Sequence, residues 1–180
     1  MSSTPSADSA RRATLRRRAA ALARVPAAEA GREDLLEVVE FSLAGGRYAV
    51  ASASVSEVLP FTHCTPLPCT PAFIPGLVNV RGRFVHVIEV GRFLGLPARG
   101  IVDLHHVLLV RHAGIELGIL ADLVTGLRRV SPAALLSPPP ALAGAGEGHV
   151  RGVTADGLAV LDVPSILSDP RQVVEEEVDL

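Results

Sequence analysis

Short apolar runs separated by glycine-containing turns recur along most of the chain, and they constrain its fold more than any other feature. From Val39 to Leu43 apolar residues alternate with polar ones, which indicates a strand with one buried face. Gly45 and Gly46 then predict a two-residue turn, and the alternation continues from Tyr48 in a return strand. The first predicted element is therefore a β-hairpin.

Three further glycine turns predict three further hairpins. They join residues 76–80 to 84–90 at Arg81, Gly82 and Arg83, residues 107–110 to 115–120 at Ala113 and Gly114, and residues 150–154 to 158–163 at Asp156 and Gly157. Residues 126–130 are also strand-like, and we expect them to extend the sheet of the 107–120 hairpin.

Proline and glycine also mark the segments that cannot be regular. Five prolines between Pro60 and Pro75 exclude a regular helix and disfavour a central strand, because proline has no N–H to donate. This segment is predicted to be an extended crossover. Residues 131–148 are rich in Pro, Ala and Gly and predict a loop with at most one helical turn.

Many short strands without alternating long helices favour an all-β barrel or sandwich. A weak internal echo suggests that the fold has two related lobes. Val80-Arg81-Gly82 and Val150-Arg151-Gly152 each precede an apolar strand, and that strand has an acidic residue near its end, Glu89 or Asp162.

The ends of the chain differ from its middle, so three regions are predicted. Residues 1–35 form an arginine- and alanine-rich extension, residues 36–168 the folded domain, and residues 169–180 an acidic tail. Within the extension, residues 14–25 are good helix formers with a narrow apolar stripe. This helix is either a basic element that docks on a partner or a solvated helix, and the sequence leaves both open.

Composition limits the classes of function. All 17 basic residues are arginine, so a phosphate-loop lysine and a Schiff-base lysine are excluded. The chain has only two cysteines, Cys64 and Cys69, which is compatible with a reducing compartment. No apolar run is long enough for a membrane helix and no secretory signal is evident, so we expect a cytoplasmic protein.

The chain lacks the motifs of an enzyme or a metal site. Cys64 and Cys69 do not form a C-x₂-C knuckle, and His105 and His106 would point to opposite faces of a strand. There is no G-x-S-x-G motif. We therefore expect no enzymatic activity and no cofactor. A protein that works through its surface is favoured, with Arg81 as the best candidate for contact because a turn holds it on a rigid base.

Residues 70–90 carry the most specific pattern, Thr-Pro-Ala-Phe-Ile-Pro-Gly-Leu-Val-Asn-Val-Arg-Gly followed by an apolar strand. This segment closely resembles the signature of the CheW family of chemotaxis coupling proteins. The Glu57-Val58 pair and the run from Gly118 to Asp122 resemble flanking motifs of the same family. The resemblance covers about residues 37–168. The family's Asp-Leu-Arg is here Glu89-Val90-Gly91, a departure that puts the choice of receptor in doubt.

The resemblance implies two SH3-like five-stranded β-barrel lobes packed together, with short helical segments and no catalysis. It implies partners as well: the regulatory domain of a CheA-type histidine kinase, the cytoplasmic tip of a methyl-accepting chemoreceptor and other CheW-like proteins in membrane receptor arrays. The extension suggests that the pathway is an accessory one, such as surface motility. The residues expected to contact partners by position are Val55, Glu57, Val58, Arg81, Gly82, Val107 and Asp122, with Val107 bordering a groove between the lobes.

The alternative is a barrel domain that binds nucleic acid or another acidic partner through the arginine-rich extension. Five Phe, one Tyr and no Trp leave few rings on which bases could stack, which disfavours nucleic acid.

Overall fold

The computed structural model describes residues 35–97, 104–140 and 146–172. The predicted basic helix in residues 14–25 and the acidic run from Glu175 to Glu177 lie outside the described residues. The folded part extends further than we predicted at its C-terminal end. Residues 170–172, which we assigned to the tail, form a 3₁₀ turn, and Arg171 and Gln172 contact the rest of the domain.

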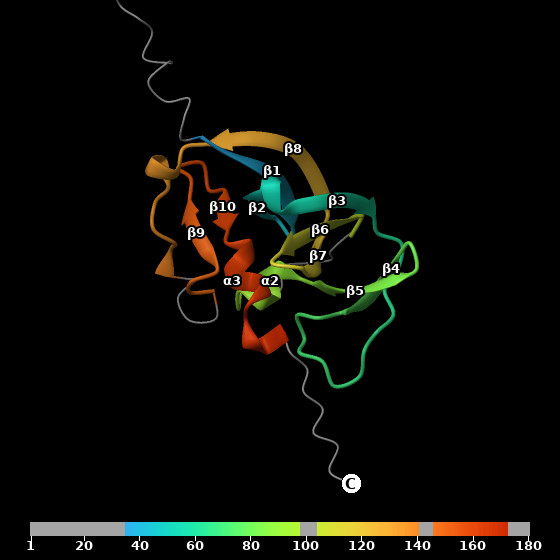
Figure 1. Cartoon of the computed structure of the whole chain (residues 1–180). Helices are drawn as coiled ribbons and strands as arrows, with labels where there is room; N and C mark the ends of the chain where they lie inside the picture. Colours follow the sequence, from blue (N-terminus) through green and yellow to red (C-terminus); the bar gives the residue numbers. More distant parts are fainter. Residues whose placement is uncertain (1–34, 98–103, 141–145, 173–180) are drawn as a thin grey trace, which may run out of the picture. The chain divides into compact units, whose positions relative to one another are not determined.

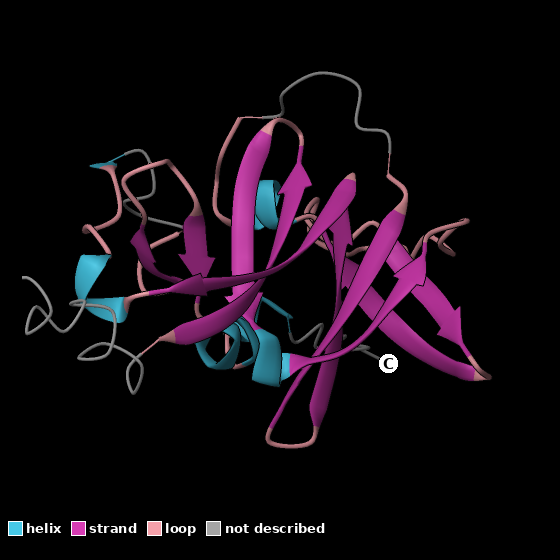
Figure 2. Cartoon of the chain, turned by 90° about the horizontal axis from the view of Figure 1, so that it is seen from above, coloured by secondary structure: helices cyan, strands magenta, loops and turns pink. Residues whose placement is uncertain are grey.

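Two five-stranded sheets make up the described chain, which confirms the all-β fold class (Figure 1). The first sheet has the order β8-β1-β2-β10-β9 and the second the order β3-β6-β7-β5-β4. The strands are β1 (Leu36–Leu43), β2 (Gly46–Ala51), β3 (Val55–Pro60), β4 (Gly76–Val80), β5 (Arg83–Ile88), β6 (His106–His112), β7 (Ile115–Ala121), β8 (Leu123–Val130), β9 (Val150–Val153) and β10 (Ala159–Leu161). The described helices are short turns, as Figure 2 shows: η1 (Ser52–Ser54), α2 (Val90–Phe93), η2 (Pro132–Ala134), α3 (Val163–Leu167) and η4 (Pro170–Gln172).

The two sheets share one pairing pattern. From edge to edge, each has two antiparallel pairings, then one parallel pairing, then a final antiparallel hairpin. Strand β3 therefore corresponds to β8, and the β4–β5 hairpin to the β9–β10 hairpin. The second sheet is continuous in sequence and is inserted between β2 and β8 of the first. This repeated topology explains why Glu89 and Asp162 each follow a corresponding strand, β5 or β10.

The corresponding hairpins β1–β2 and β6–β7 use the same turn. Ala44 and Gly45 have φ values of 51° and 75°, and Ala113 and Gly114 have values of 48° and 85°. Two successive positive φ values define the type I′ turn, whose twist matches that of the strands. Our prediction of a turn at Gly45 and Gly46 was wrong by one residue, because Gly46 already pairs with Leu43 in the ladder.

Buried apolar side chains form three cores on the faces of the two sheets. A large central core lies between them and includes Phe41, Ile88 and Leu117. A second core, with Val85 and Val107, lies on the other face of the second sheet. A third core, with Val38, Ala49, Leu158 and Val160, lies on the other face of the first sheet. Strand β1 is therefore buried on both faces, and our prediction of one solvated face was wrong.

Two other sequence predictions need correction. Strand β8 pairs with β1 in the first sheet and does not extend the sheet of the β6–β7 hairpin. The two Val-Arg-Gly runs do not occupy equivalent places, since Arg81 and Gly82 form a turn whereas Arg151 and Gly152 lie within β9. The acidic residues of the echo are equivalent, because Glu89 precedes α2 and Asp162 precedes α3, each as the N-cap residue.

Candidate partner-binding site

An ion pair between Arg81 and Glu57 joins the two edge strands of the second sheet. Arg81 lies in the β4–β5 turn, and its Nη2 donates to Oε1 of Glu57 on β3 at 2.6 Å. The arginine side chain is 78% exposed and the glutamate side chain 31%. The sequence placed these two residues 24 positions apart, and the fold brings them into contact. An exposed guanidinium held in one position is suited to bind a partner's carboxylate.

The turn that carries Arg81 is held by its own residues. Arg81 and Gly82 have φ values of 51° and 83°, and the N–H of Gly82 donates to Oδ1 of Asn79 at 2.8 Å. The positive φ at Gly82 favours glycine, because a side chain there would be strained. Gly82 thus positions Arg81 rather than offering a side chain of its own.

Val55 and Val58 lie on β3 beside Glu57. Val58 is 39% exposed and is among the large apolar side chains that face solvent. Val55 is partly buried and packs against the central core. Glu57 and Arg81 therefore present a carboxylate and a guanidinium together at the edge of the second sheet, while Val58, the next residue of β3, points to the other face of the strand.

Val107 is buried, with 2% of its surface exposed. It belongs to the core on the far face of the second sheet, so our expectation that it borders a groove between the lobes was wrong. Instead it lines a pocket of about 100 Å³ between β3 and β4, together with Leu59 and Leu77. Any contact between Val107 and a partner would have to be made through this small opening.

Asp122 lies between β7 and β8, where the chain passes from one sheet to the other. Its Oδ2 accepts a hydrogen bond from the N–H of Ala44 at 2.7 Å, and its own N–H donates to the carbonyl of Ser42. Its Oδ1 is buried without a partner among the described residues. These contacts tie the crossing to the β1–β2 turn, and they do not bring Asp122 into contact with Arg81 or Glu57.

The structure reveals exposed apolar residues that sequence reasoning missed. Leu127 on edge strand β8 is 68% exposed, and Leu123 on the same strand is 56% exposed. Phe84 on β5 is 67% exposed. The alternation in β8 was visible in the sequence, but alternation alone does not say whether the apolar face is covered. Apolar side chains on an unpaired edge strand are a common feature of interaction surfaces.

A second ion-pair network was also missed, at the equivalent place in the first sheet. Arg128 on β8 donates two hydrogen bonds, at 2.8 and 2.9 Å, to Asp156 in the β9–β10 turn. Arg47 pairs with both Glu40 and Asp156. Hydrogen bonds from Arg128 lower the pKa of Asp156 well below its usual range, and a bond from Thr154 adds to the effect.

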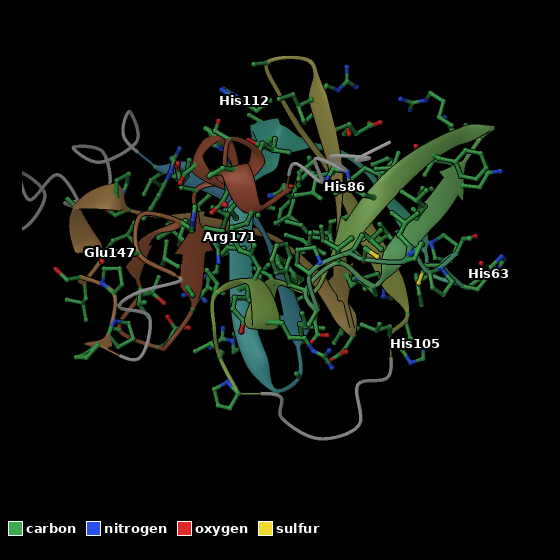
Figure 3. The ribbon with its side chains drawn as sticks, turned by 90° about the horizontal axis from the view of Figure 1, so that it is seen from below. His63, His86, His105, His112, Glu147 and Arg171 are labelled. Atoms are coloured by element: carbon green, nitrogen blue, oxygen red, sulfur yellow. The ribbon has the colours of Figure 1, made fainter. Side chains whose placement is uncertain are left out.

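A polar cluster around Arg171 fastens the end of the described chain. Arg171 donates to both carboxylate oxygens of Asp169, and its guanidinium lies 4.4 Å from the centre of the Phe93 ring. His149 lies 2.8 Å from Asp169 through Nε2 and 2.8 Å from Ser165 Oγ through Nδ1. In the view of Figure 3, from below, Arg171 lies near the centre of the picture. Arg171 already neutralises Asp169, and Ser165 does not line the pocket beside Val107. The Ser165–His149–Asp169 hydrogen bonds therefore fit a structural role.

Another pocket, of about 300 Å³, lies elsewhere. It is lined by residues of the first sheet, such as Tyr48, and by residues in and next to α2, including Glu89 and Arg92, but by none of the predicted contact residues. Among the described residues, no group of three or more His, Cys, Asp or Glu side chains could hold a metal ion. In Figure 3, His112 lies far from both His63 and His105. No helix in the described ranges is long and apolar enough to cross a membrane.

A family model described as the CheW-like domain matches residues 37–171. The chain belongs to the CheW-like family. Protein FrzA of Myxococcus xanthus is 34% identical over 131 residues, which cover 70% of this chain and 81% of FrzA. Protein PilI of Pseudomonas aeruginosa is 31% identical over 110 residues, covering 61% of this chain and 62% of PilI. The crystal structure of the scaffolding protein TtCheW from Thermoanaerobacter tengcongensis superposes with a TM-score of 0.60 at 28% identity, covering 72% of this chain and 90% of TtCheW.

Membership of the CheW-like family settles the class of function. The protein is a non-enzymatic adaptor or scaffold in a chemosensory pathway. The resemblance noted in residues 70–90 is therefore confirmed, and the two five-stranded sheets are those of the CheW fold.

Proposed function

We propose that this CheW-like protein couples methyl-accepting chemoreceptors to a CheA-type histidine kinase. The observation that carries the proposal is the Arg81–Glu57 pair. It holds an exposed guanidinium at the rim of the second sheet, and exposed Val58 lies on the other face of the same edge strand. Charged groups at such a surface set orientation and association rate, and apolar groups add affinity.

The kinase partner is expected to be the regulatory domain of CheA, which is itself CheW-like in this family. Arg81 would donate hydrogen bonds to a carboxylate of that domain, in place of Glu57 or in addition to it. Because the pair is exposed, the guanidinium can exchange partners at little cost. Gly82 would contribute by keeping the turn in the conformation that presents Arg81.

The receptor partner is expected to be the helical cytoplasmic tip of a chemoreceptor. A receptor helix offers an apolar stripe, and exposed Val58, Leu123 and Leu127 are apolar side chains on the two edge strands β3 and β8. Such a protein would act in the cytoplasm and be recruited to membrane receptor arrays. FrzA and PilI, at 34% and 31% identity, are more similar to this chain than the curated relatives named CheW, at 24–26%.

Reconstitution tests the proposal. Receptor-containing vesicles and CheA from the same organism are mixed with the protein, and kinase autophosphorylation and co-sedimentation are measured. We expect the protein to bring the kinase to the vesicles and raise its activity. The Arg81→Glu variant should fail to recruit the kinase, and Leu127→Glu should fail to bind the receptor. Full activity in both variants would contradict the proposed surfaces.

A further inference from the structure

One face of the second sheet is covered along only part of its length. On β5, Val85 and Val87 point into the core on the far face, so Phe84, His86 and Ile88 point to the opposite face. Ile88 is fully buried in the central core, whereas Phe84 is 67% exposed. This face of β5 is therefore buried at Ile88 and exposed to solvent near the tip of the β4–β5 hairpin.

On the neighbouring strands, the apolar side chains of this face also become exposed toward the same end of the sheet. On β7, Leu117 and Ile119 lie in the central core, and Ile115 on the same face is 50% exposed. The parallel register pairs Val87 with Gly118, and continuing it brings Phe84 level with Ile115. Leu77 on β4 lies opposite His86 and is partly buried. We call Leu77, Phe84 and Ile115 the sheet-end patch.

The end of the described chain reaches the border of this patch. Helix α3 packs against β6 and β7. Gln172, at the end of the next helical turn η4, contacts β5, with its Oε1 3.1 Å from Nε2 of His86. His86 is two residues from Phe84 on the same face of the strand, a separation of about 7 Å. The polypeptide thus leaves the described part immediately beside the uncovered apolar side chains.

The sequence that follows Gln172 has a composition that suits the patch. Residues 173–180 read Val-Val-Glu-Glu-Glu-Val-Asp-Leu, with four apolar and four acidic residues. Eight residues can span up to about 26 Å, well beyond the distance to Phe84. By the same alternation, Arg83 and Arg111 point to the far face of the sheet together with Val85 and Leu109. The acidic side chains of the segment would therefore face solvent while its apolar side chains contact the patch.

We propose that residues 173–180 bind across the sheet-end patch, with their valines and leucine on Leu77, Phe84 and Ile115 and their carboxylates toward solvent. The patch is then an internal docking surface for the C-terminal segment. The docking does not depend on the proposed coupling function, since it requires no partner.

The test compares the full chain with a chain that ends at Gln172, using NMR chemical shifts of the Leu77 and Phe84 amides and the Ile115 methyl group. We expect all three signals to shift on truncation and to return when a synthetic peptide of residues 173–180 is added to the shortened chain. Phe84→Ser should abolish this response to the peptide. Leu127→Ser, a change at an equally exposed apolar residue on β8, should leave it intact.

Two results would overturn the proposal. Shift changes confined to the neighbours of Gln172, with the sheet-end patch unaffected, would show that the segment does not bind there. Shifts of the patch that depend on protein concentration, and persist in the truncated chain, would show that a second copy of the protein occupies it instead.

Discussion

Arg81 and Asp156 occupy equivalent positions in the two sheets and carry opposite charges. Arg81 lies in the β4–β5 turn and pairs with Glu57 on β3, while Asp156 lies in the corresponding β9–β10 turn and pairs with Arg128 on β8. Each sheet therefore has an ion pair between the turn of its edge hairpin and its opposite edge strand. The turn carries the positive charge in the second sheet and the negative charge in the first. A partner that recognises one end of the molecule by charge will not recognise the other.

The Arg81–Glu57 pair should matter little for stability. Both side chains reach solvent, and exposed pairs contribute at most about 1 kcal/mol. We expect Arg81→Ala to lower the free energy of unfolding, measured by urea titration, by less than that amount. A loss as large as that of a core substitution would show that Arg81 is structural and would weaken its assignment to an interface.

The carboxylate of Asp156 should stabilise the fold down to unusually low pH. Hydrogen bonds from Arg128 lower its pKa, so its stabilising effect is present above the usual Asp pKa of about 3.9 and is lost only as pH falls through the depressed folded value. The difference in Tm between the parent and Asp156→Asn should therefore be constant from pH 7 to about 5 and shrink below about 4. A difference that vanishes already near neutral pH would contradict the network.

Arg171 should contribute more than a surface arginine, because it pairs with buried Asp169 and stacks on Phe93. Replacing it by alanine leaves a buried carboxylate without its main partner, and we expect a loss of about 2 kcal/mol in unfolding free energy. Arg171→Lys keeps the charge but not the planar donor set, and it should give an intermediate loss. Equal stability of all three proteins in guanidinium titrations would refute this role.

Gly76 should tolerate no side chain. Its φ is 153°, and a Cβ there would lie 2.1 Å from the backbone oxygen of Thr65. We expect Gly76→Ala to cost more than about 2 kcal/mol, because the bridge between Thr65 and Leu77 would have to open. Gly82→Ala meets open space and should cost only about 1–2 kcal/mol of backbone strain, which makes it the matched control.

Local patterns in the sequence predicted the hairpins well, because glycine turns and alternating residues depend on near neighbours. The β4–β5, β6–β7 and β9–β10 hairpins formed as expected. The β1–β2 turn was displaced by one residue, since Ala44 adopts a positive φ that we assigned to glycine.

The assignment of strands to sheets could not be read from local patterns. Strand β8 follows β7 directly, yet it pairs with β1, about 90 residues earlier. Burial of β1 on both faces depends on Leu158 and Val160 far along the chain. The same long-range pairing of strands brings Glu57 and Arg81 into contact. It also buries Val107 in a core, and the local sequence pattern around Val107 does not show whether its side chain is buried or exposed.

The most direct test of the central claim is calorimetric titration of this protein with the isolated regulatory domain of a CheA kinase from the same organism. We predict micromolar affinity, roughly −8 kcal/mol, with at least a tenfold loss for Arg81→Glu. We expect no loss for Arg129→Glu, because Arg129 is a similarly exposed arginine on the other sheet, at 70% against 78% for Arg81. No binding by the parent protein, or equal binding by Arg81→Glu, would contradict the claim that this surface couples the protein to a kinase.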